Sequence, residues 1–342
     1  SLKVEVLILD EPTTGISAAQ RITLFTALRR LASEGKIIIL VSHKLEDVQE
    51  ICQRVTVLRQ GKVAGQISLP CSNACLVEMM FGQILADNLR PMIALGEVVL
   101  ELTDLAAVDG ERRISGLNLA VLAGEVIGLA GLEGSGQSLL LRTCAGLLRP
   151  SAGRLCLGKV DLTGAPYACY RTAGVAYLPA DRLEEGLIPG MNLFEHLVLA
   201  GRGKSGIFVD WKGAKERMAV CIKKYNIKGR PETPVETLSG GNQQRLLLAL
   251  LPETIRVLLM EHPTRGLDLE SAHWCWQDLL ERRNRGTAII FTSTDAEEIL
   301  EYSDRVMVFS GGKATPPLPV SELTANRLGE LIGGAEFLPP EK

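Results

Sequence analysis

The sequence predicts an α/β fold with a mainly parallel sheet, built as one whole domain preceded by the C-terminal part of a second, homologous copy. Uninterrupted apolar runs alternate with segments of helical spacing, which is typical of buried parallel strands joined by helices. Equivalent residues also recur at a constant spacing of 251 positions. The pairs that keep their identity are Pro12 and Pro263, Gly35 and Gly286, Arg54 and Arg305, and Gly61 and Gly312. A repeat held over about 60 residues without a gap indicates two copies of one domain.

Composition limits the class of protein. The 342 residues, of which 46% are hydrophobic and 23% charged, suffice for one globular domain and a fragment of another. A net charge of −3 provides no basic surface, so we expect no nucleic-acid partner. The longest apolar runs, such as Ile37–Val41 and Leu246–Leu251, are far shorter than the roughly 20 residues of a membrane-spanning helix. The 8 scattered cysteines lack histidines near them to complete a metal site, and we expect reduced thiols, as in the cytoplasm.

The first copy is expected over residues 1–82 and opens directly on a strand. Val4–Leu9 is a continuous apolar run ending in Asp10 and Glu11, which is typical of a buried parallel strand with acids at its carboxyl end. The elements expected after it are a helix over Ala18–Glu34, a strand over Lys36–Ser42, a helix through Gln53, a hairpin of Val55–Leu58 and Val63–Ile67, and a helix over Cys71–Phe81. Because Ser1 stands almost directly before the first strand, we expect the front part of this copy to be missing.

The second copy is expected over residues 97–322, after a linker over residues 83–96 that contains Pro91 and Gly96. Strands are predicted near Val98–Leu102, Leu117–Val121 and Val126–Ala130, followed by a glycine-rich turn and a helix over Ser138–Leu148. Residues 170–251 have mainly helical spacing. The order of strand, acids, helix, strand and helix then returns up to about residue 314, and residues 323–342 are expected to form a C-terminal tail.

The glycine-rich turn has the spacing of a phosphate-binding P-loop. It reads Gly-Leu-Glu-Gly-Ser-Gly-Gln-Ser over residues 131–138, between a strand and a helix, where backbone N–H groups and the helix N-terminus can face phosphates. The residues expected to contact a nucleotide are Gly131, Gly134, Ser135, Gly136, Gln137 and Ser138. Gln137 stands where the pattern calls for lysine. Loss of that charge-assisted hydrogen bond weakens binding by about 1.5–3 kcal/mol, or roughly 10- to 100-fold.

A second glycine motif, Leu-Ser-Gly-Gly-Asn-Gln-Gln over residues 238–244, precedes the apolar helix at Arg245–Leu251. Ser239 is expected to cap this helix, while Gly240 and Gly241 leave the amides of its first turn open to a phosphate presented from outside. Gln243 is included among the residues expected near the nucleotide. An ordinary capped helix is the alternative.

Equivalent strand ends carry different side chains in the two copies. In the first copy, Asp10 and Glu11 end one strand and His43 follows the next. Carboxylates placed in this way can hold a metal and activate a nucleophile. In the second copy the corresponding residues are Glu261, His262 and Thr294. A neutral imidazole at His262 could accept a proton near pH 7, but simple loss of the catalytic glutamate is the favoured interpretation.

Through the glycine-rich turn, the Leu-Ser-Gly-Gly motif, both strand-acid segments and the His43 loop, the chain resembles the ATP-binding subunits of ABC transporters. The resemblance covers essentially all of residues 4–335. It implies a P-loop NTPase-like ABC ATPase domain with a mainly parallel sheet, an antiparallel β subdomain and a helical subdomain. Unequal tandem sites, Asn-Gln-Gln after the signature glycines, and Pro-Thr-Arg-Gly-Leu-Asp over residues 263–268 make it most similar to importers of monosaccharides and nucleosides.

The resemblance implies ATP and Mg²⁺ as cofactors, with each ATP between the P-loop and acids of one domain and the signature motif of the other. Asp10 would hold Mg²⁺ through water, Glu11 would orient or deprotonate the attacking water, and His43 would contact the γ-phosphate. The residues implied for the second copy's own site are Ser138 and Glu261 as metal ligands, with His262 and Asp268 near the nucleotide. Ser239, Gly240 and Gly241 would reach across to the first site.

The second copy departs from the family pattern at every catalytic position. Ala180 also stands where the family usually has Gln or Glu, and no aromatic residue lies between Gly96 and Ala130 to stack on adenine. We therefore expect its site to bind weakly and to hydrolyse poorly, and this chain alone to be nearly inactive.

For the full-length protein the resemblance implies a transport ATPase at the cytoplasmic face of the membrane. Its partners would be integral-membrane permease subunits and, indirectly, a periplasmic or lipoprotein solute-binding protein. A regulatory nucleotide-binding module without transport, or a soluble non-transport ABC protein, are the alternatives.

Overall fold

The computed structural model describes residues 5–13, 18–42, 45–59, 61–81, 93–202 and 209–333. The chain divides into two compact units. The first comprises residues 1–88 with 268–270, and the second comprises residues 89–267 with 271–342. Parallel and antiparallel sheets occur together with helices, which confirms the predicted α/β class. Among the described residues, no helix combines the length and the apolar character needed to cross a membrane.

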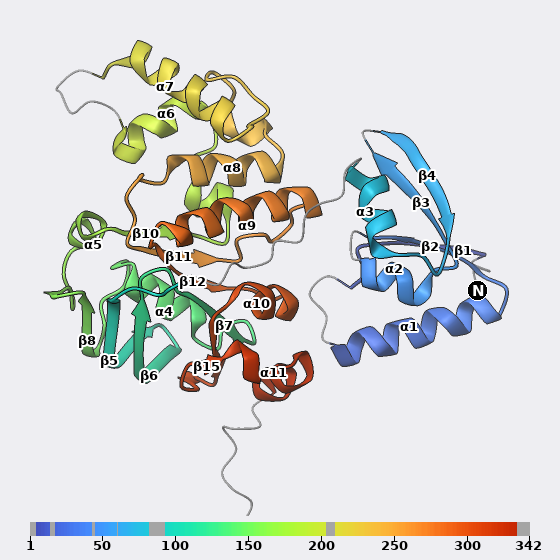
Figure 1. Cartoon of the computed structure of the whole chain (residues 1–342), viewed down its shortest axis with the longest axis horizontal. Coiled ribbons are helices and arrows are strands. Elements are labelled where there is room, and N and C mark those ends of the chain that lie inside the picture. The colour runs from blue at the N-terminus through green and yellow to red at the C-terminus, as the bar shows by residue number, and fades with distance from the viewer. Residues whose placement is uncertain are drawn as a thin grey trace, which may run out of the picture. The chain divides into compact units, whose positions relative to one another are not determined.

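The first unit contains a parallel pair of strands, β1 (Val6–Asp10) and β2 (Ile37–Val41), connected through helix α1 (Ala18–Ser33) (Figure 1). Helix α2 (Leu45–Ile51) leads into an antiparallel hairpin, and a last helix follows it. These elements are β3 (Arg54–Arg59), β4 (Lys62–Ser68) and α3 (Asn73–Phe81). The predicted order of elements in this unit is confirmed.

The prediction that the first strand is buried is wrong in this structure. Ile8 on β1 is 65% exposed and Ile37 on β2 is 59% exposed, and exposure alternates along both strands. A parallel strand is buried on both faces only where neighbouring strands and helices cover it. Within the described part of the first unit, β1 pairs only with β2, so one face of this small sheet stays open.

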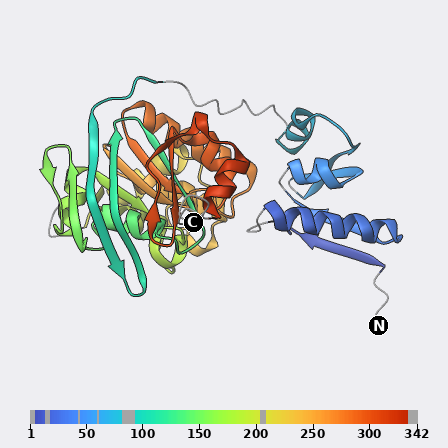
Figure 2. The same cartoon turned by 90° about the horizontal axis from the view of Figure 1, so that it is seen from below.

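The second unit contains two sheets, and Figure 2 shows the long strands β5 and β6 (teal) along one side of it. The central sheet has the order β10 (Val175–Leu178), β11 (Val257–Glu261), β12 (Ala288–Thr292), β7 (Val126–Gly131), β13 (Arg305–Ser310) and β14 (Lys313–Ala314), with β15 (Leu318–Pro319) also paired to β13. Its first five strands are parallel. The antiparallel sheet has the order β6 (Arg112–Leu122), β5 (Val98–Asp109), β8 (Ala152–Leu157) and β9 (Val160–Asp161).

Helices connect the strands of the second unit and extend it at one end. They are α4 (Gln137–Cys144), α5 (Tyr167–Ala173), α6 (Leu193–Leu197), α7 (Trp211–Lys224), α8 (Gly240–Leu250), α9 (Leu269–Asn284), α10 (Ala296–Tyr302) and α11 (Ala325–Ile332), with short helical turns η1 (Arg182–Gly186), η2 (Val198–Arg202), η3 (Val235–Thr237) and η4 (Val320–Glu322). Helices α6, α7 and α8 lie together at one end of this unit (Figure 1), as a helical subdomain would.

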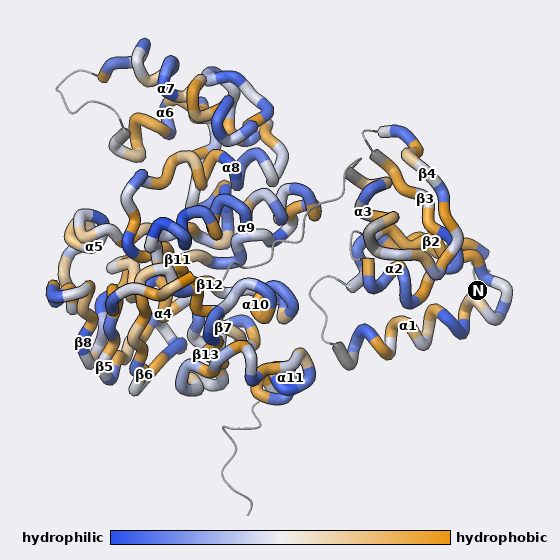
Figure 3. The backbone as a smooth tube through the Cα atoms, in the orientation of Figure 1, coloured by the Kyte–Doolittle hydropathy of each residue, from blue (hydrophilic) through white to orange (hydrophobic). Residues whose placement is uncertain are grey.

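Alternating side chains of the central strands separate two cores. On β11, Leu258 and Met260 pack with the helices, whereas Val257 and Leu259 pack in the core shared with α4 and the antiparallel sheet. Figure 3 shows hydrophobic stretches along β11 and β12, whose residues are all buried. Burial on both faces is what a central parallel strand requires, and it fixes the strand ends on which the site residues sit.

One expectation for the second unit is refined and another is corrected. The segment 170–251 consists mainly of helices and turns, as expected, but residues 175–178 form the strand β10 at the edge of the central sheet. A run of four residues is too short for its periodicity to separate a strand from a helix. The expected tail from residue 323 contains α11, in which Leu328 and Leu331 are fully buried and anchor the helix in the core.

The two copies share their backbone register. Val6 pairs with Ile37 and Asp10 with Val41 in the first unit. At the same spacing, Val257 pairs with Ala288 and Glu261 with Thr292 in the second. Helices α1, α2 and α3 correspond in the same way to α9, α10 and α11. The repeat seen in the sequence is therefore a repeat of structure from β1 to α3.

Candidate functional site

The glycine-rich turn connects β7 to α4, as predicted. Its three glycines, Gly131, Gly134 and Gly136, have φ angles of 145°, 84° and 126°, which residues other than glycine rarely adopt. A Cβ on Gly136 would lie 2.5 Å from Ile114 Cγ2, so glycine is also required there for space. The N–H of Ser135 donates to the carbonyl of Leu132 at 3.0 Å and tightens the turn. Backbone N–H groups gathered in this way can cradle an anion.

Gln137 occupies the first position of α4 and is only 6% exposed. Its Nε2 atom donates to the carbonyl of Leu132 at 3.3 Å, so the side chain closes the turn on itself. The neutral amide supplies no charge to the pocket at the position where a P-loop carries lysine.

Ser138 lies next to Gln137 on α4 and contacts the end of β11. Its Oγ donates to Glu261 Oε1 at 2.6 Å, and the hydroxyl of Tyr177 on β10 donates to the same oxygen at 2.7 Å. Arg142 Nε lies 3.7 Å from that oxygen, while its Nη2 donates to Glu185 at 2.5 Å. Burial, together with the hydrogen bond to Glu261, raises the pKa of Tyr177. The hydrogen bond to Glu185 is the main cause of the raised pKa of Arg142.

Sequence reasoning missed Tyr177 and Arg142 as members of this group. Arg142 stands four residues after Ser138 on one helix, a spacing that places two side chains on the same face and could have indicated it. Tyr177 is 84 positions away from Glu261, and no local pattern signals that contact.

A pocket of about 330 Å³ lies over this group. Its lining includes all the predicted turn residues except Ser135, together with Glu261, His262 and Thr294. Ala180 also lines it. The glycine cradle fits a phosphate, and the pocket can accommodate a phosphate chain. The donor set does not fit Mg²⁺ as well, because Glu261 Oε1 already accepts from Ser138 Oγ and from the Tyr177 hydroxyl.

The residues after β1 and β11 adopt the same unusual backbone conformation. Glu11 has φ 45° and its N–H donates to Val41 at 2.9 Å, and His262 has φ 47° and its N–H donates to Thr292 at 2.8 Å. Asp10, directly before Glu11, is exposed. Both units thus present a side chain at the same place beyond the carboxyl end of the strand. His43 lies outside the described residues.

His262 differs from Glu11 in its chemistry. Its Nδ1 atom is buried and has no hydrogen-bond partner among the described residues. Burial and the nearby Arg265 lower the pKa of His262, so the imidazole is neutral at physiological pH. His262 and the uncharged Gln137 both line this pocket.

The Ser-Gly-Gly motif begins α8. Ser239 is the residue before the first helical turn, but the predicted cap is wrong in one respect: its side chain makes no capping bond to the helix backbone. Its Oγ instead accepts from Asn242 Nδ2 at 2.7 Å, which leaves the amides of Gly240 and Gly241 without that cap. Gln243 is buried and donates to the carbonyl of Leu238 at 3.1 Å, so it supports the turn from within.

Arg182 contacts the helix that this motif begins, and Asp268 is the last predicted site residue to place. Asp268 is exposed directly before α9. Arg182 Nε donates to Gln244 at 3.0 Å, and its Nη2 donates to the carbonyl of Arg265. Arg182 therefore links η1 both to α8 and to the loop that follows β11, a contact that the sequence did not predict.

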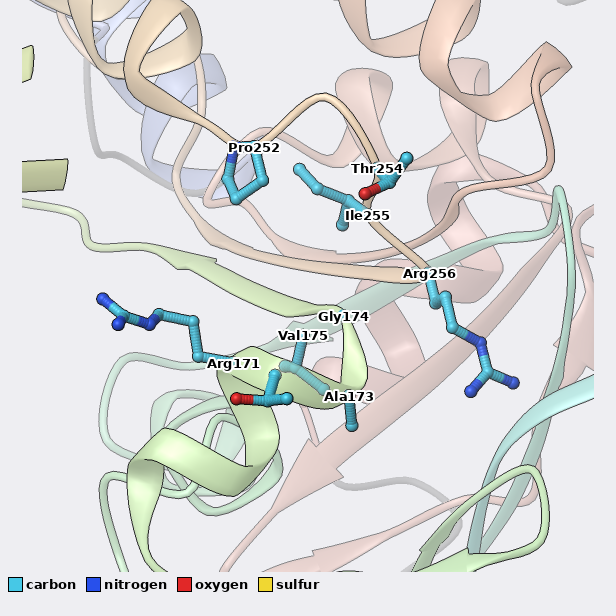
Figure 4. Close-up of a pocket in the computed structure, with 9 residues that line it drawn as sticks. Arg171, Ala173, Gly174, Val175, Pro252, Thr254, Ile255 and Arg256 are labelled. Carbon is cyan, nitrogen blue, oxygen red and sulfur yellow. The ribbon is translucent and has the colours of Figure 1, made fainter. Parts of the chain in front are cut away.

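A second pocket, of about 320 Å³, lies among residues 171–175, at the start of β10, and residues 252–256, before β11 (Figure 4). Arg171 and Arg256 flank it, but their side chains point away from one another (Figure 4). None of the predicted site residues lines it.

Comparison with known proteins identifies the family. Residues 114–265 match the model of the ABC transporter family. The chain is 35% identical over 344 residues to a ribose import ATP-binding protein of Rubrobacter xylanophilus, which covers 98% of the chain and 68% of that protein. It is 34% identical to a glucose import ATP-binding protein of Haloferax volcanii (97% and 63% covered) and 31% identical to a nucleoside import ATP-binding protein of Lactococcus lactis (97% and 68% covered). The chain thus spans 63% to 68% of the length of these relatives.

Solved structures agree with this assignment at the level of fold. An ATP-binding subunit of an ABC transporter superimposes with a TM-score of 0.57 at 20% identity, covering 69% of this chain and 99% of that one. A nucleotide-free ATP-binding cassette gives a TM-score of 0.55 at 21% identity, covering 64% and 90%. Together with the glycine-rich turn, the Ser-Gly-Gly helix start and the repeated strand ends, these matches show that the chain belongs to the ATP-binding proteins of ABC transporters, in the group of sugar and nucleoside import ATP-binding proteins.

Proposed function

We propose that the protein to which this chain belongs hydrolyses ATP to drive uptake of a simple sugar or a nucleoside. The proposal rests on one observation: a pair of acidic side chains and the glycine-rich turns lie in different copies. The first unit has an acid pair, Asp10 and Glu11, at the end of β1, whereas the second unit has the glycine-rich turn and the Ser-Gly-Gly start of α8. Relatives that import glucose, ribose and nucleosides support the class of solute.

In the proposed reaction the first copy supplies the catalytic groups. Asp10 would hold Mg²⁺ through water, and Glu11 would orient or deprotonate the attacking water. His43 would contact the γ-phosphate, and the family resemblance implies that Ser239, Gly240 and Gly241 would reach that phosphate from the other domain. Mg²⁺ would neutralise charge on the phosphates. The left-handed backbone at Glu11, fixed by its N–H bond to Val41, aims the carboxylate beyond the strand end.

The second copy is proposed to bind nucleotide without hydrolysing it efficiently. Gly131, Gly134, Ser135 and Gly136 would provide the phosphate cradle, with Gln137 in place of a lysine. His262 stands where the first copy has its glutamate base, and it is neutral at physiological pH. Residues 1–88 contain no counterpart of the turn at residues 131–138, so we propose that this chain alone is nearly inactive.

Coupling to transport is proposed to occur through residues 181–199. This segment contains η1 and α6, and its exposed apolar side chains include Ile188 at 50% and Leu199 at 56% exposure. They would contact integral-membrane permease subunits, placing the protein at the cytoplasmic face of the membrane. A solute-binding protein would act on the permease from the other side.

The proposal is tested with the full-length protein and its permease subunits reconstituted in vesicles. We expect ATP-dependent uptake, and Glu11→Gln should lower hydrolysis by about 10²–10⁴-fold because it removes the general base. His262→Gln is the matched change in the second copy and should have little effect. Equal losses in both variants, or a failure of the ATPase to associate with the permease, would contradict the proposed function. Hydrolysis by this chain alone at the rate of the whole protein would contradict its proposed inactivity.

A further inference from the structure

The pocket of the second unit contains a carboxylate, Glu261, that neighbouring side chains of the same unit already hydrogen-bond and pair. Glu261 is 7% exposed, and its Oε1 accepts from Ser138 at 2.6 Å and from Tyr177 at 2.7 Å. Arg142 Nε lies 3.7 Å from the same oxygen. A buried carboxylate costs free energy unless it is paired and hydrogen-bonded, and here both conditions are met by side chains of the same unit.

A divalent cation would have to compete with Ser138 and Tyr177 for Glu261 Oε1. Mg²⁺ requires near-octahedral oxygen ligands at about 2.0–2.1 Å and gives up its waters reluctantly. Ser138 and Glu261, the two side chains expected to serve it, are bonded to each other, and Ala180 in the same pocket has no ligand atom. An ion beside Glu261 would also meet the Arg142 guanidinium, a like charge. Among the described residues, no three His, Cys, Asp or Glu side chains form a group suited to a metal.

Arginine side chains can take over the charge that the cation would supply. Arg112, Arg142 and Arg265 line the pocket together with three carboxylates, and Arg142 is held in place by Glu185 at 2.5 Å. Arginine stays charged throughout the physiological pH range and pairs well with phosphate. The cations of this pocket are therefore arginines of the chain itself and not exchangeable ions, and the three carboxylates balance their formal charge.

We propose that the pocket of the second unit does not bind Mg²⁺ and that the phosphates of a nucleotide bind there without a divalent cation. This inference rests on the proposed function, because it takes a nucleotide as the ligand. It makes the two copies differ in cofactor as well as in catalytic residues.

Binding of Mn²⁺ to the full chain tests the metal directly. Free Mn²⁺ is counted by electron paramagnetic resonance without nucleotide, because ADP itself binds Mn²⁺, using Asp10→Asn with Glu11→Gln to remove the acid pair of the first unit. We expect no bound Mn²⁺ below about 1 mM, a concentration that corresponds to a very weak site. One Mn²⁺ per chain that Glu261→Gln abolishes would overturn the inference.

Nucleotide affinity gives an independent readout. Calorimetric titration with ADP in MgCl₂ and in EDTA should yield dissociation constants within about twofold of each other, whereas a tenfold tightening by Mg²⁺ would overturn the inference. Lack of ADP binding in both solutions would overturn the nucleotide part of it. Association with the permease tests the proposed function separately and depends on neither result.

Variants that weaken the contacts of Glu261 should gain metal binding if those contacts are what excludes the ion. Glu261→Asp with Tyr177→Phe shortens the carboxylate and removes one of its donors, and we expect at least tenfold tighter Mn²⁺ binding. If this double variant does not fold, Tyr177→Phe alone, which loses a single hydroxyl, should show a smaller gain. Tyr170→Phe is the matched control, since its hydroxyl bonds to the carbonyl of Leu162 outside the pocket, and it should change nothing. Absence of any gain would refute the argument from Glu261.

Discussion

Replacing Thr264 by valine should destabilise the second unit, because it removes a hydrogen bond to a buried charge. Thr264, in the loop after β11, donates from Oγ1 to Glu298 Oε1 on α10 at 2.5 Å, and Trp276 Nε1 on α9 donates to the same oxygen at 2.7 Å. Glu298 is 8% exposed, so water cannot replace a lost donor. Valine keeps the shape of threonine, which isolates the effect of the hydroxyl.

The size of the effect follows from the charge of the acceptor. A hydrogen bond to a charged group contributes about 1.5–3 kcal/mol, and an ionised Glu298 left with one donor fewer loses that amount. For a domain of this size, each kcal/mol lowers the midpoint of thermal unfolding by about 2–4 °C, so Thr264→Val should lower it by roughly 3–12 °C. Differential scanning calorimetry and urea unfolding at pH 7 measure both quantities.

Two further variants make this prediction refutable. Thr264→Ser keeps the hydroxyl and should stay within about 0.5 kcal/mol of the unchanged chain. In the first unit, Thr13 donates to the buried Asp47 from the equivalent positions, so Thr13→Val should destabilise that unit in the same way. If Thr264→Val and Thr264→Ser lower stability equally, methyl packing and not the hydrogen bond to Glu298 is responsible, and the reasoning fails.

Three more outcomes are expected. Burial raises the pKa of Glu298 above its ordinary 4.5, so the folded state holds the proton more tightly than the unfolded state does. The free energy of unfolding should therefore fall as the pH rises from 4.5 through the raised pKa. Glu298→Gln should remove this pH dependence, as measured by urea unfolding. Gly136→Ala forces a Cβ into a positive-φ position without space, which should cost about 1–3 kcal/mol and abolish ADP binding by calorimetry; normal binding would contradict the glycine requirement. Arg305 Nε lies 2.6 Å from Oε1 of the buried Glu125, so Arg305→Ala leaves a buried carboxylate without its ion-pair partner and should lower the free energy of unfolding in urea by about 3–5 kcal/mol. Arg54→Ala, at the exposed equivalent position of the first unit, should lower it by under about 0.5 kcal/mol. Similar losses in the two variants would refute the pairing argument.

The order of elements followed from local signals in the sequence. Gly35, Gly61 and the apolar runs between them mark helix ends and strands, and the constant spacing of the repeat gave the correspondence that strand registers confirm. The turn at residues 131–138 was predictable because its glycines must adopt positive φ angles at fixed positions.

What the sequence did not give depends on contacts between distant residues. The exposure of Ile8 depends on which strands lie beside β1, and an apolar run carries no information on its neighbours. The direction of the Gln137 side chain, and the meeting of Tyr177 with Glu261, result from packing of β10, α4 and β11. The prediction of a tail, by contrast, overlooked a signal that was present: Leu328, Leu331 and Ile332 have helical spacing, and α11 corresponds to the predicted helix α3.

The left-handed conformation shared by Glu11 and His262 has a consequence for protein engineering. Because the main chain at position 262 already follows the path that it has at Glu11, the proposed general base, His262→Glu would introduce a carboxylate without rebuilding the main chain. If the second copy hydrolyses ATP poorly, as we propose, this exchange is the first step towards restoring its activity.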